Sequence, residues 1–311
     1  MKKVLSLLVA LALMLPLAAC HAPEAEDDLR PQIVATLFPQ YDFARNLVGE
    51  ECAVTLLLPP GTEAHAWEPT PADIIKISEC DLFIYTGADM EAWAADILKA
   101  VEGVKVLDLS AVLDLSCFEE HDHSHEVYDH GEHSHEHEPH YWCDPVLASQ
   151  MVESIAKELA EMLPDSAGDI EERRDAYLAE LAALDGEFRA IAAEADSKTI
   201  YHGGKFAFYY FAHEYGFDYL AAYDSCIGES EPSAAVVASL IDAVKAGDAG
   251  AIFYEELTDP KVARAISEDC GVPMLLLHSC HNLTADEIAA GEDYLSLMKQ
   301  NAANLRSALC R

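Results

Sequence analysis

The segment from His121 to His140 concentrates histidine to a degree that packing cannot explain, since it holds eight of the chain's fourteen histidines in twenty residues. Most of its other residues are acidic or small and polar, so it offers little apolar surface to offset the entropy of ordering it. We therefore expect a solvated loop. Imidazole is a common ligand of transition metals, and a short histidine-rich tract is typical of metal binding. An expression tag has a similar composition, but tags stand at chain ends and rarely contain so much acid.

Four histidines occupy comparable places, in connections that follow predicted strands or lead into predicted helices: His65, His140, His202 and His281. His278 is a near neighbour of the last one. In open α/β sheets, ligands bind beyond the carboxyl ends of the strands, where such connections meet. One such histidine alone is ordinarily a hydrogen-bonded loop residue. Four together suit the tetrahedral nitrogen coordination that Zn²⁺ accepts, so the sequence predicts a zinc site made by these four.

Alternating strand and helix patterns predict the elements that position these histidines. Apolar runs rich in β-branched residues indicate strands, and apolar residues at helical spacing indicate helices. The predicted strands are residues 32–38, 53–58, 81–85 and 104–107 in the first half, and 198–201, 219–222, 249–254 and 273–277 in the second. Helical patterns separate them. We therefore expect an α/β protein with two lobes, each a mostly parallel sheet flanked by helices.

A helical pattern at residues 170–195 runs without proline for about seven turns and separates the two halves. We expect an N-terminal lobe at residues 32–168, with the histidine-rich loop at 117–138, a connecting helix at 169–195 and a C-terminal lobe at 196–311. The cleft between two such lobes is the predicted place of the metal site.

The first residues predict export and a lipid anchor. Residues 1–19 join two lysines to an apolar run that is short for a membrane span, as in a secretion signal. The small residues before Cys20 resemble a bacterial lipobox, which predicts a lipidated Cys20 followed by a flexible tether at residues 20–31. We expect an extracytoplasmic protein, periplasmic or at the cell surface, that is anchored to the cell membrane.

Charge and cysteine content narrow the possible partners. A formal net charge of −37 repels phosphate backbones, so nucleic-acid binding is not expected, whereas cations are attracted. Of nine cysteines, eight remain after Cys20, an even number in a compartment that permits disulfides. We predict the pairs Cys226–Cys280 and Cys270–Cys310. Zinc ligation by thiolates is disfavoured because no Cys-x-x-Cys occurs.

The chain resembles, over essentially its whole length, the zinc- and manganese-specific solute-binding lipoproteins of bacterial ABC importers. The most specific stretches are LLPPGTEAHAWEPTPAD at residues 57–73, the acidic histidine-rich loop, PHYWCDP at 139–145 and GEDYLSLM at 291–298. The resemblance implies two lobes joined by a long helix. It also implies first-lobe ligands at His65 and His140 and a late-chain ligand at His281, with His278 as the alternative.

The third ligand is where this chain departs from the family. The family usually has a histidine just before the aromatic start of a helix, where this chain has Lys205. A lysine amine is protonated at neutral pH and is a poor zinc ligand. His202 is one replacement, since the two glycines that follow it allow close backbone approach. Water completing a three-histidine site is a second. A third is a carboxylate, from Glu63, Glu229 or Glu255.

Histidine-dominated ligands favour Zn²⁺ over Mn²⁺, which prefers carboxylates and water, while Cu²⁺ and Ni²⁺ stay open. The resemblance implies a monomeric protein that captures Zn²⁺ and delivers it to the permease of an ABC importer. The loop would gather weakly bound zinc through seven accessory histidines: His121, His123, His125, His130, His133, His135 and His137. The alternatives are a surface zinc-binding adhesin, a zinc reservoir, or manganese uptake.

An enzyme is not expected. The chain contains no His-Glu-x-x-His helix. It also lacks the nucleophile motif Gly-x-Ser-x-Gly and the phosphate-binding motif Gly-x-x-x-x-Gly-Lys. A zinc site filled by protein ligands leaves no open position for a reactive water. A site of three histidines and water would again be compatible with a hydrolytic metalloenzyme.

Overall fold

The computed structural model describes residues 29–115, 138–223 and 231–311. Pro31–Arg311 forms one compact unit. The predicted signal and lipidated Cys20 lie outside the described residues, as do the accessory histidines from His121 to His137. These assignments stay predictions.

Four short strands of the first half form one parallel sheet: β1 (Gln32–Ala35), β2 (Ala53–Leu56), β3 (Leu82–Tyr85) and β4 (Lys105–Asp108). Their order is β2-β1-β3-β4, and Ala35 at the end of β1 pairs with Leu56 and Ile84. Every residue of β3 is buried, which explains its continuous apolar sequence. The helices of this half are α2 (Phe38–Val48), α3 (Pro71–Glu79) and α4 (Ala94–Ala100).

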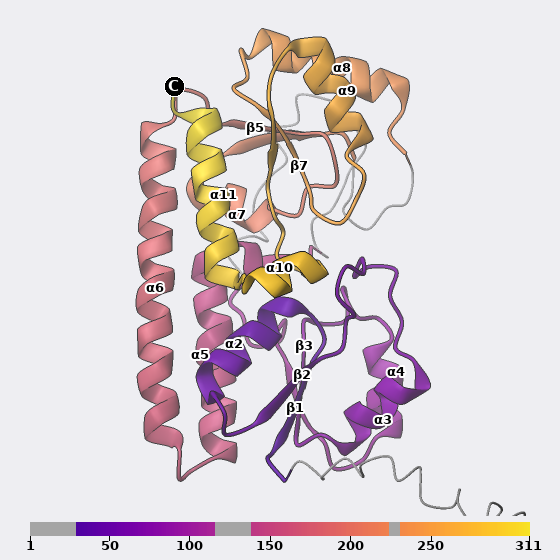
Figure 1. Cartoon of the computed structure of the whole chain (residues 1–311), viewed down its shortest axis with the longest axis vertical. Coiled ribbons are helices and arrows are strands. Elements are labelled where there is room, and N and C mark those ends of the chain that lie inside the picture. The colour runs from indigo at the N-terminus through magenta and orange to yellow at the C-terminus, as the bar shows by residue number, and fades with distance from the viewer. Residues whose placement is uncertain (1–28, 116–137, 224–230) are drawn as a thin grey trace, which may run out of the picture. The chain divides into compact units, whose positions relative to one another are not determined.

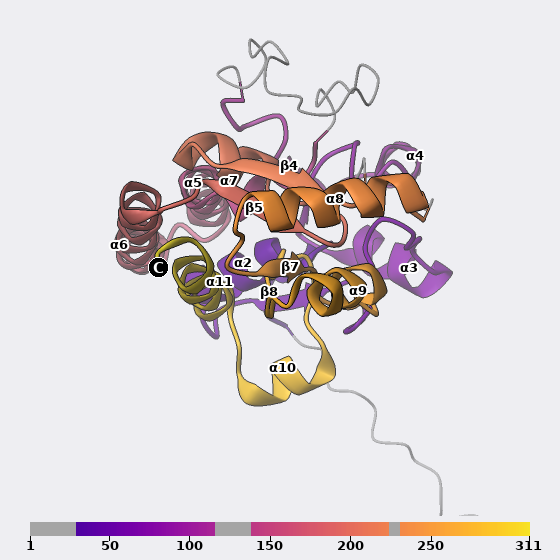
Figure 2. The same cartoon turned by 90° about the horizontal axis from the view of Figure 1, so that it is seen from above.

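The second half repeats this plan with a parallel sheet of four strands: β5 (Thr199–His202), β6 (Asp218–Ala221), β7 (Ile252–Tyr254) and β8 (Met274–Leu276). The order β6-β5-β7-β8 matches that of the first sheet. Its helices are α7 (Tyr209–Tyr215), α8 (Ala234–Ala246) and α9 (Lys261–Cys270). Helix α9 packs against β7, β8 and α8 (Figure 2). The predicted α/β fold with two parallel sheets flanked by helices is confirmed.

A single long helix, α6 (Ala167–Glu194), connects the two halves. Its 28 residues span about 42 Å at 1.5 Å per residue. It runs beside α5 (Pro145–Met162) and α11 (Tyr294–Leu309) and also contacts α2 and α7 (Figure 1). Leu181, Leu184, Phe188 and Ile191 form a buried stripe at helical spacing. Because one helix packs on elements of both halves, it limits independent motion of the two sheets.

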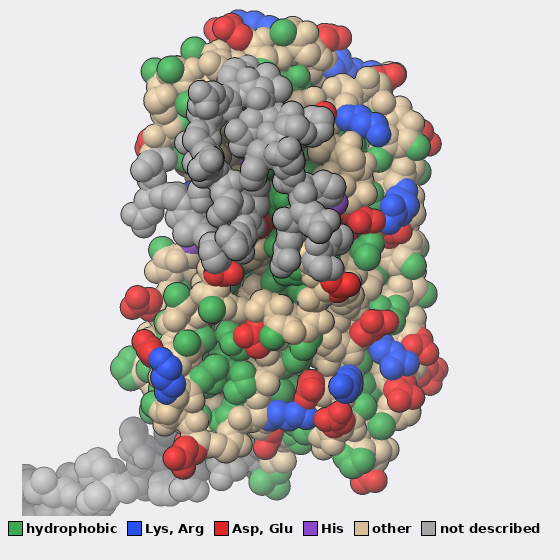
Figure 3. Space-filling view, turned by 180° about the vertical axis from the view of Figure 1, so that it is seen from behind, with side chains coloured by type: hydrophobic (Ala, Val, Ile, Leu, Met, Phe, Trp, Pro, Cys, Tyr) green, Lys and Arg blue, Asp and Glu red, His purple; other side chains and the backbone are tan. Residues whose placement is uncertain are grey.

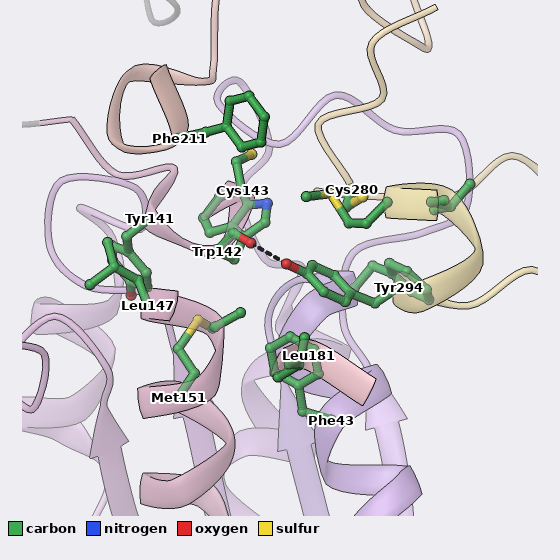
Figure 4. Close-up of a cluster of buried hydrophobic side chains, with 14 of the residues drawn as sticks. Phe43, Tyr141, Trp142, Cys143, Leu147, Met151, Leu181, Phe211, Cys280 and Tyr294 are labelled. Carbon is green, nitrogen blue, oxygen red and sulfur yellow. Dashed lines mark hydrogen bonds between the residues drawn. The ribbon is translucent and has the colours of Figure 1, made fainter. Parts of the chain in front are cut away.

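The two halves share a continuous hydrophobic core. Tyr294 of α11 packs its ring edge against Phe43 of α2, with ring centroids 4.9 Å apart. Its hydroxyl donates to the carbonyl of Trp142 at 2.6 Å (Figure 4). Its backbone N–H donates to Asp42 Oδ2. A helix from the end of the chain is thereby fixed to the first half by buried polar contacts.

Two short elements have no counterpart among the predicted ones: the 3-10 turn η2 (Tyr141–Cys143) and helix α10 (Ala285–Ala290). Helix α10 buries none of its residues, so it carries no apolar periodicity that a sequence pattern reveals. Its start is fixed instead by a capping box between Thr284 and Glu287.

The cysteines differ from prediction. Cys270 and Cys310 are both free thiols, so the predicted Cys270–Cys310 disulfide is wrong. Each thiol contacts a backbone carbonyl of a different helix, Ile241 in α8 and Ile191 in α6, which holds the two sulfurs at separate places. Cys280 is also free and fully buried, and Cys226 lies outside the described residues.

The surface agrees with the strongly negative charge. Acidic side chains are scattered over the face in Figure 3, with fewer basic ones among them. Within residues 29–115, 138–223 and 231–311, no helix is long and apolar enough to cross a membrane.

Candidate metal centre

The loop after β2 holds His65 through contacts from the far end of the chain. The side-chain amide of Asn282 donates to the carbonyls of Pro59 and Thr62 at 2.7 and 2.9 Å, and the Gly61 N–H donates to the Leu283 carbonyl at 2.7 Å. Gly61 has a φ of +74°, a conformation that glycine adopts without strain. The position of His65 is therefore set by the loop after β8.

Within the same turn, Glu63 accepts from the N–H groups of His65 and Ala66, one on each carboxylate oxygen, both at 3.2 Å. This carboxylate holds the backbone that carries the imidazole. Both of its oxygens are thereby in use.

His140 stands just before η2 and is 1% exposed. Its Nδ1 makes a very short contact with Glu138 Oε1. A carboxylate only accepts, so the ring proton lies on Nδ1 and the lone pair lies on Nε2. The following Trp142 donates from Nε1 to the Ser279 carbonyl at 2.7 Å. His140 is thus oriented by Glu138, and its segment is fixed to the loop after β8.

His281 lies in that loop after β8, and its backbone carbonyl accepts from the Phe38 N–H at 3.2 Å. Its Nδ1 contacts the Ser279 hydroxyl and lies 3.2 Å from Glu256 Oε1. Its Nε2 is buried and has no hydrogen-bond partner among the described residues. A buried nitrogen without a partner is costly, and a bound cation would satisfy it.

The three histidines meet at one small pocket. It has a volume of about 40 Å³ and is lined by Glu63, His65, His140, Lys205, Ala207, Glu255, Glu256, Thr258, Ser279 and His281. Sites for organic ligands are roughly 300–1,000 Å³. The pocket therefore suits an ion with a water molecule or two.

His65 and His140 already lie at the spacing of two ligands on one metal. Their Nε2 atoms are 3.1 Å apart. Two nitrogens bound to one tetrahedral zinc at about 2.0–2.1 Å are separated by about 3.3 Å. Across the described parts of the chain, however, no three His, Cys, Asp or Glu side chains are already close enough together to hold a metal. Binding therefore requires His281 or another ligand to turn toward the pair.

Burial keeps the imidazoles of His65 and His281 neutral, as metal ligation requires. Burial, together with His140, His281 and Lys205, lowers the pKa of His65 to about 2. Burial also lowers the pKa of His281, although Glu256 opposes this effect. Burial opposes ionisation of Glu256, but the neighbouring histidines and hydrogen bonds from Ser279 lower its pKa below the ordinary value. An anionic Glu256 beside Nδ1 of His281 favours the tautomer with its proton on Nδ1, which leaves the lone pair on Nε2.

The other histidine candidates lie away from the pocket lining. His202, the last residue of β5, is fully buried, and its Nδ1 accepts from the Gly204 N–H at 3.2 Å. His278 lies 3.6 Å from Glu256 and 3.3 Å from Glu287, and its N–H and carbonyl bond to the Asn301 side chain. Of the two late-chain candidates, His281 lines the pocket and His278 does not.

Among the carboxylates predicted as substitutes, Glu63 and Glu255 line the pocket and Glu229 lies outside the described residues. Lys205 lines the pocket as well.

Sequence reasoning missed the two carboxylates that orient the imidazoles, Glu138 and Glu256. Glu138 is two residues before His140, at the end of the predicted acidic loop. Glu256 follows β7 and reaches His281 only because β7 and β8 are neighbours in the sheet. The Glu-Pro-His spacing was an available signal for the first. The second depends on strand pairing.

Two parallel sheets bridged by a continuous helix, with histidines from both halves around one ion-sized pocket, define a two-lobed solute-binding protein. The chain belongs to the family described as zinc-uptake complex component A, periplasmic (ZnuA), whose model matches residues 33–308. This confirms the resemblance that the sequence motifs indicated.

Relatives and solved structures agree with this placement. The high-affinity zinc uptake system protein ZnuA of Bacillus subtilis is 33% identical over 317 residues, which cover 99% of this chain and 98% of that protein. The zinc-binding lipoprotein AdcA of Streptococcus pneumoniae is 32% identical over 308 residues, 98% of this chain. This chain spans only 61% of that relative's length. The Zn(II)-bound ZnuA-like domain of AdcA superposes with a TM-score of 0.74 at 29% identity, covering 91% of this chain and 100% of that domain.

Proposed function

We propose that the chain captures Zn²⁺ outside the cytoplasmic membrane and delivers it to the permease of an ABC importer. The observation that carries the proposal is the meeting of three imidazoles, from His65, His140 and His281, at one pocket of about 40 Å³. Membership of the zinc-uptake family supports the transport role. In this proposal the protein is a monomer, is held to the cell membrane by a lipid on Cys20, and has no catalytic activity.

The donor set supports zinc over manganese. Three neutral imidazole nitrogens suit Zn²⁺, whereas Mn²⁺ prefers carboxylate and water oxygens. His140 and His281 each have a carboxylate on Nδ1, from Glu138 and Glu256. Such carboxylate–histidine pairs fix the ring orientation and raise the basicity of the ligating nitrogen. Fixed nitrogen ligands of this kind suit Zn²⁺, which proteins usually hold with four ligands in a tetrahedral arrangement.

The lobes of the proposed protein are residues 32–168 and 196–311, joined by the helix predicted at 169–195. The position of α6 at Ala167–Glu194 supports these limits. Buried contacts cross between the halves, such as Trp142 Nε1 to the Ser279 carbonyl and the Tyr210 hydroxyl to the Glu138 carbonyl. Zinc capture is therefore expected to involve small movements of side chains and loops rather than a wide opening of the lobes.

The test is zinc calorimetry on a chain from which residues 117–137 are deleted, so that the accessory histidines do not obscure the pocket while Glu138 stays in place beside His140. We expect one tight site, which His65→Ala or His281→Ala abolishes. His213→Ala, an exposed histidine on α7, is the matched control and should leave the site unchanged. Unchanged zinc affinity in both pocket variants would show that this site is not the one that binds zinc.

Delivery to a permease needs a separate experiment. A strain that lacks the protein should grow poorly when zinc is limiting, and the chain with intact His65 should restore growth while His65→Ala should not. Normal growth of the deletion strain at limiting zinc would instead favour a surface adhesin or a zinc reservoir.

A further inference from the structure

The three histidines leave the fourth position of a tetrahedral zinc site open, and this chain has Lys205 where its family usually has a histidine. Structural zinc sites take four protein ligands, while open sites keep water. If the site takes four protein ligands, the fourth comes from the remaining polar groups of the pocket, which include Glu63, Glu255 and Glu256.

Two of these carboxylates already have other partners. Both oxygens of Glu63 accept from the backbone of its own turn. Glu256 accepts from the N–H and hydroxyl of Ser279 and lies against Nδ1 of His281. Moving either carboxylate onto a metal breaks contacts that orient a histidine ligand.

Glu255 differs from these two carboxylates in its hydrogen-bond contacts. It follows directly after β7 and lines the pocket. Its Oε1 accepts from the Thr258 hydroxyl at 3.1 Å, but its Oε2 is buried and has no hydrogen-bond partner among the described residues. A buried carboxylate oxygen without a donor costs free energy, which a bound cation recovers. Its unpaired oxygen makes Glu255 the available anionic donor.

The backbone beside Glu255 has no room for a side chain. A Cβ added to Gly204 would lie 1.6 Å from Glu255 Oε2, and one added to Gly203 would lie 2.5 Å from the Cα of Ala263. The two glycines therefore let β5, α9 and the Glu255 side chain approach one another closely. The fold therefore determines where this carboxylate lies, unlike an exposed side chain that is able to adopt several rotamers.

His202 directly precedes the same two glycines in the chain. Because its Nδ1 accepts from the Gly204 N–H, the proton of the neutral ring is on Nε2. Nitrogen Nε2 is buried, has no partner among the described residues and in this tautomer is a donor, not a metal ligand. Gly204, whose N–H donates to His202 Nδ1, also lies directly against Glu255 Oε2, so the imidazole and the carboxylate are neighbours of the same glycine.

We propose that Glu255 is the fourth zinc ligand of this chain, through Oε2, and that His202 is a positioning residue that offers its Nε2–H to Glu255. The inference rests on the proposed function, since it completes the same site. It gives the site three imidazole nitrogens and one carboxylate oxygen, divided between the two halves of the chain. It also explains how Lys205 replaces a histidine without loss of a complete ligand set.

The experiment uses Co²⁺ and Zn²⁺ on the chain lacking residues 117–137, which keeps Glu138 beside His140. Four-coordinate Co²⁺ absorbs strongly in the visible range, so its spectrum reports ligand number and type. We expect Glu255→Gln to lower zinc affinity about 10- to 100-fold and to weaken and shift the cobalt bands. Glu268→Gln, the same change at an exposed carboxylate on α9, is the matched control and should keep the four-coordinate spectrum.

The role of His202 is tested by two substitutions. His202→Gln places an amide N–H near the position of Nε2 and should keep the cobalt spectrum, whereas His202→Leu should shift it toward that of Glu255→Gln. Thermal melts confirm that each variant is folded. If Glu255→Gln has a wild-type spectrum and affinity, or if His202→Gln loses the bands as fully as His202→Leu, the proposal is wrong. Loss of binding in His65→Ala alongside a normal Glu255→Gln would overturn only this inference and would leave the proposed function standing.

Discussion

Nε2 of His65 and Nε2 of His140 lie 3.1 Å apart, although the two residues come from loops 75 positions apart in the chain. Two neutral imidazoles at this distance share at most one proton, so each ring limits the tautomer of the other. In the proposed site this pair is a preformed half, which the remaining ligands have to complete.

This relationship predicts strong coupling between the two residues. His65→Ala and His140→Ala should each lower zinc affinity by at least about 100-fold, because a half-site with one imidazole has lost its preformed geometry. The double variant should lose little more than either single one, since residues that act as a unit are not additive. Zinc competition with a chromogenic chelator measures all three, and simple additivity of the two losses would contradict the coupling.

Glu138 should tune zinc affinity without being a ligand. Glu138→Gln removes the charge beside Nδ1 of His140 but keeps a possible acceptor, so we expect a loss of about 10- to 100-fold in zinc affinity. Glu153→Gln, a change on an exposed part of α5, serves as the control. Equal affinities of the two variants in competition titrations would show that Glu138 does not orient the ring.

Lys205 places a positive charge in the pocket that receives a dication. Replacing it with methionine keeps the length of the side chain and removes the repulsion, so Lys205→Met should raise zinc affinity by about tenfold at low salt. The gain should shrink as ionic strength increases, because salt screens a partly exposed charge. Lys299→Met on α11 is the charge-matched control. A tighter site in both variants would point to overall charge rather than to Lys205.

The contact between Tyr294 and Trp142 should contribute to global stability. Tyr294→Phe removes the hydroxyl that donates to the buried Trp142 carbonyl at 2.6 Å and leaves that carbonyl without this donor. We expect the free energy of unfolding to fall by about 1–3 kcal/mol in urea denaturation. Tyr41→Phe, a half-buried tyrosine of α2, is the control and should change it by less. No difference between the two would mean that the contact contributes nothing measurable.

The raised pKa of the buried Glu91 predicts that the stability of the folded protein depends on pH. Glu91 is buried, and burial raises its pKa to about 7 despite hydrogen bonds from Thr36 and Gly87. The folded state therefore binds a proton that the unfolded state has already released above about pH 4.5, the ordinary value for glutamate. Stability should fall as pH rises from about 4.5 to 7, by up to about 3 kcal/mol.

Glu91→Gln should flatten this part of the pH profile in denaturant titrations, since an amide does not titrate. Glu102→Gln, an exposed change, should leave the slope as in the wild type. A variant at Glu91 that keeps the wild-type slope would assign the pH dependence to other groups.

The sequence by itself determined the class of fold and three members of the pocket. Runs such as LFIY in β3 read as buried strands because a strand covered on both faces is apolar throughout. His65, His140 and His281 were identifiable because histidines recur where strands end, and the motifs around them match one family. These signals are local in the sequence, so they can be recognised without a structure.

The tertiary structure decided what depends on distant segments meeting. Only strand pairing brings Glu256 to His281, and only the close approach of β5 and α9 over Gly203 and Gly204 places Glu255 at the pocket. The same holds for the Cys270 and Cys310 thiols, which an even count of cysteines suggested as a pair and which lie against different helices. Residue types indicate which atoms are able to bind a metal. Burial and hydrogen bonding then decide which of those atoms remain available to do so.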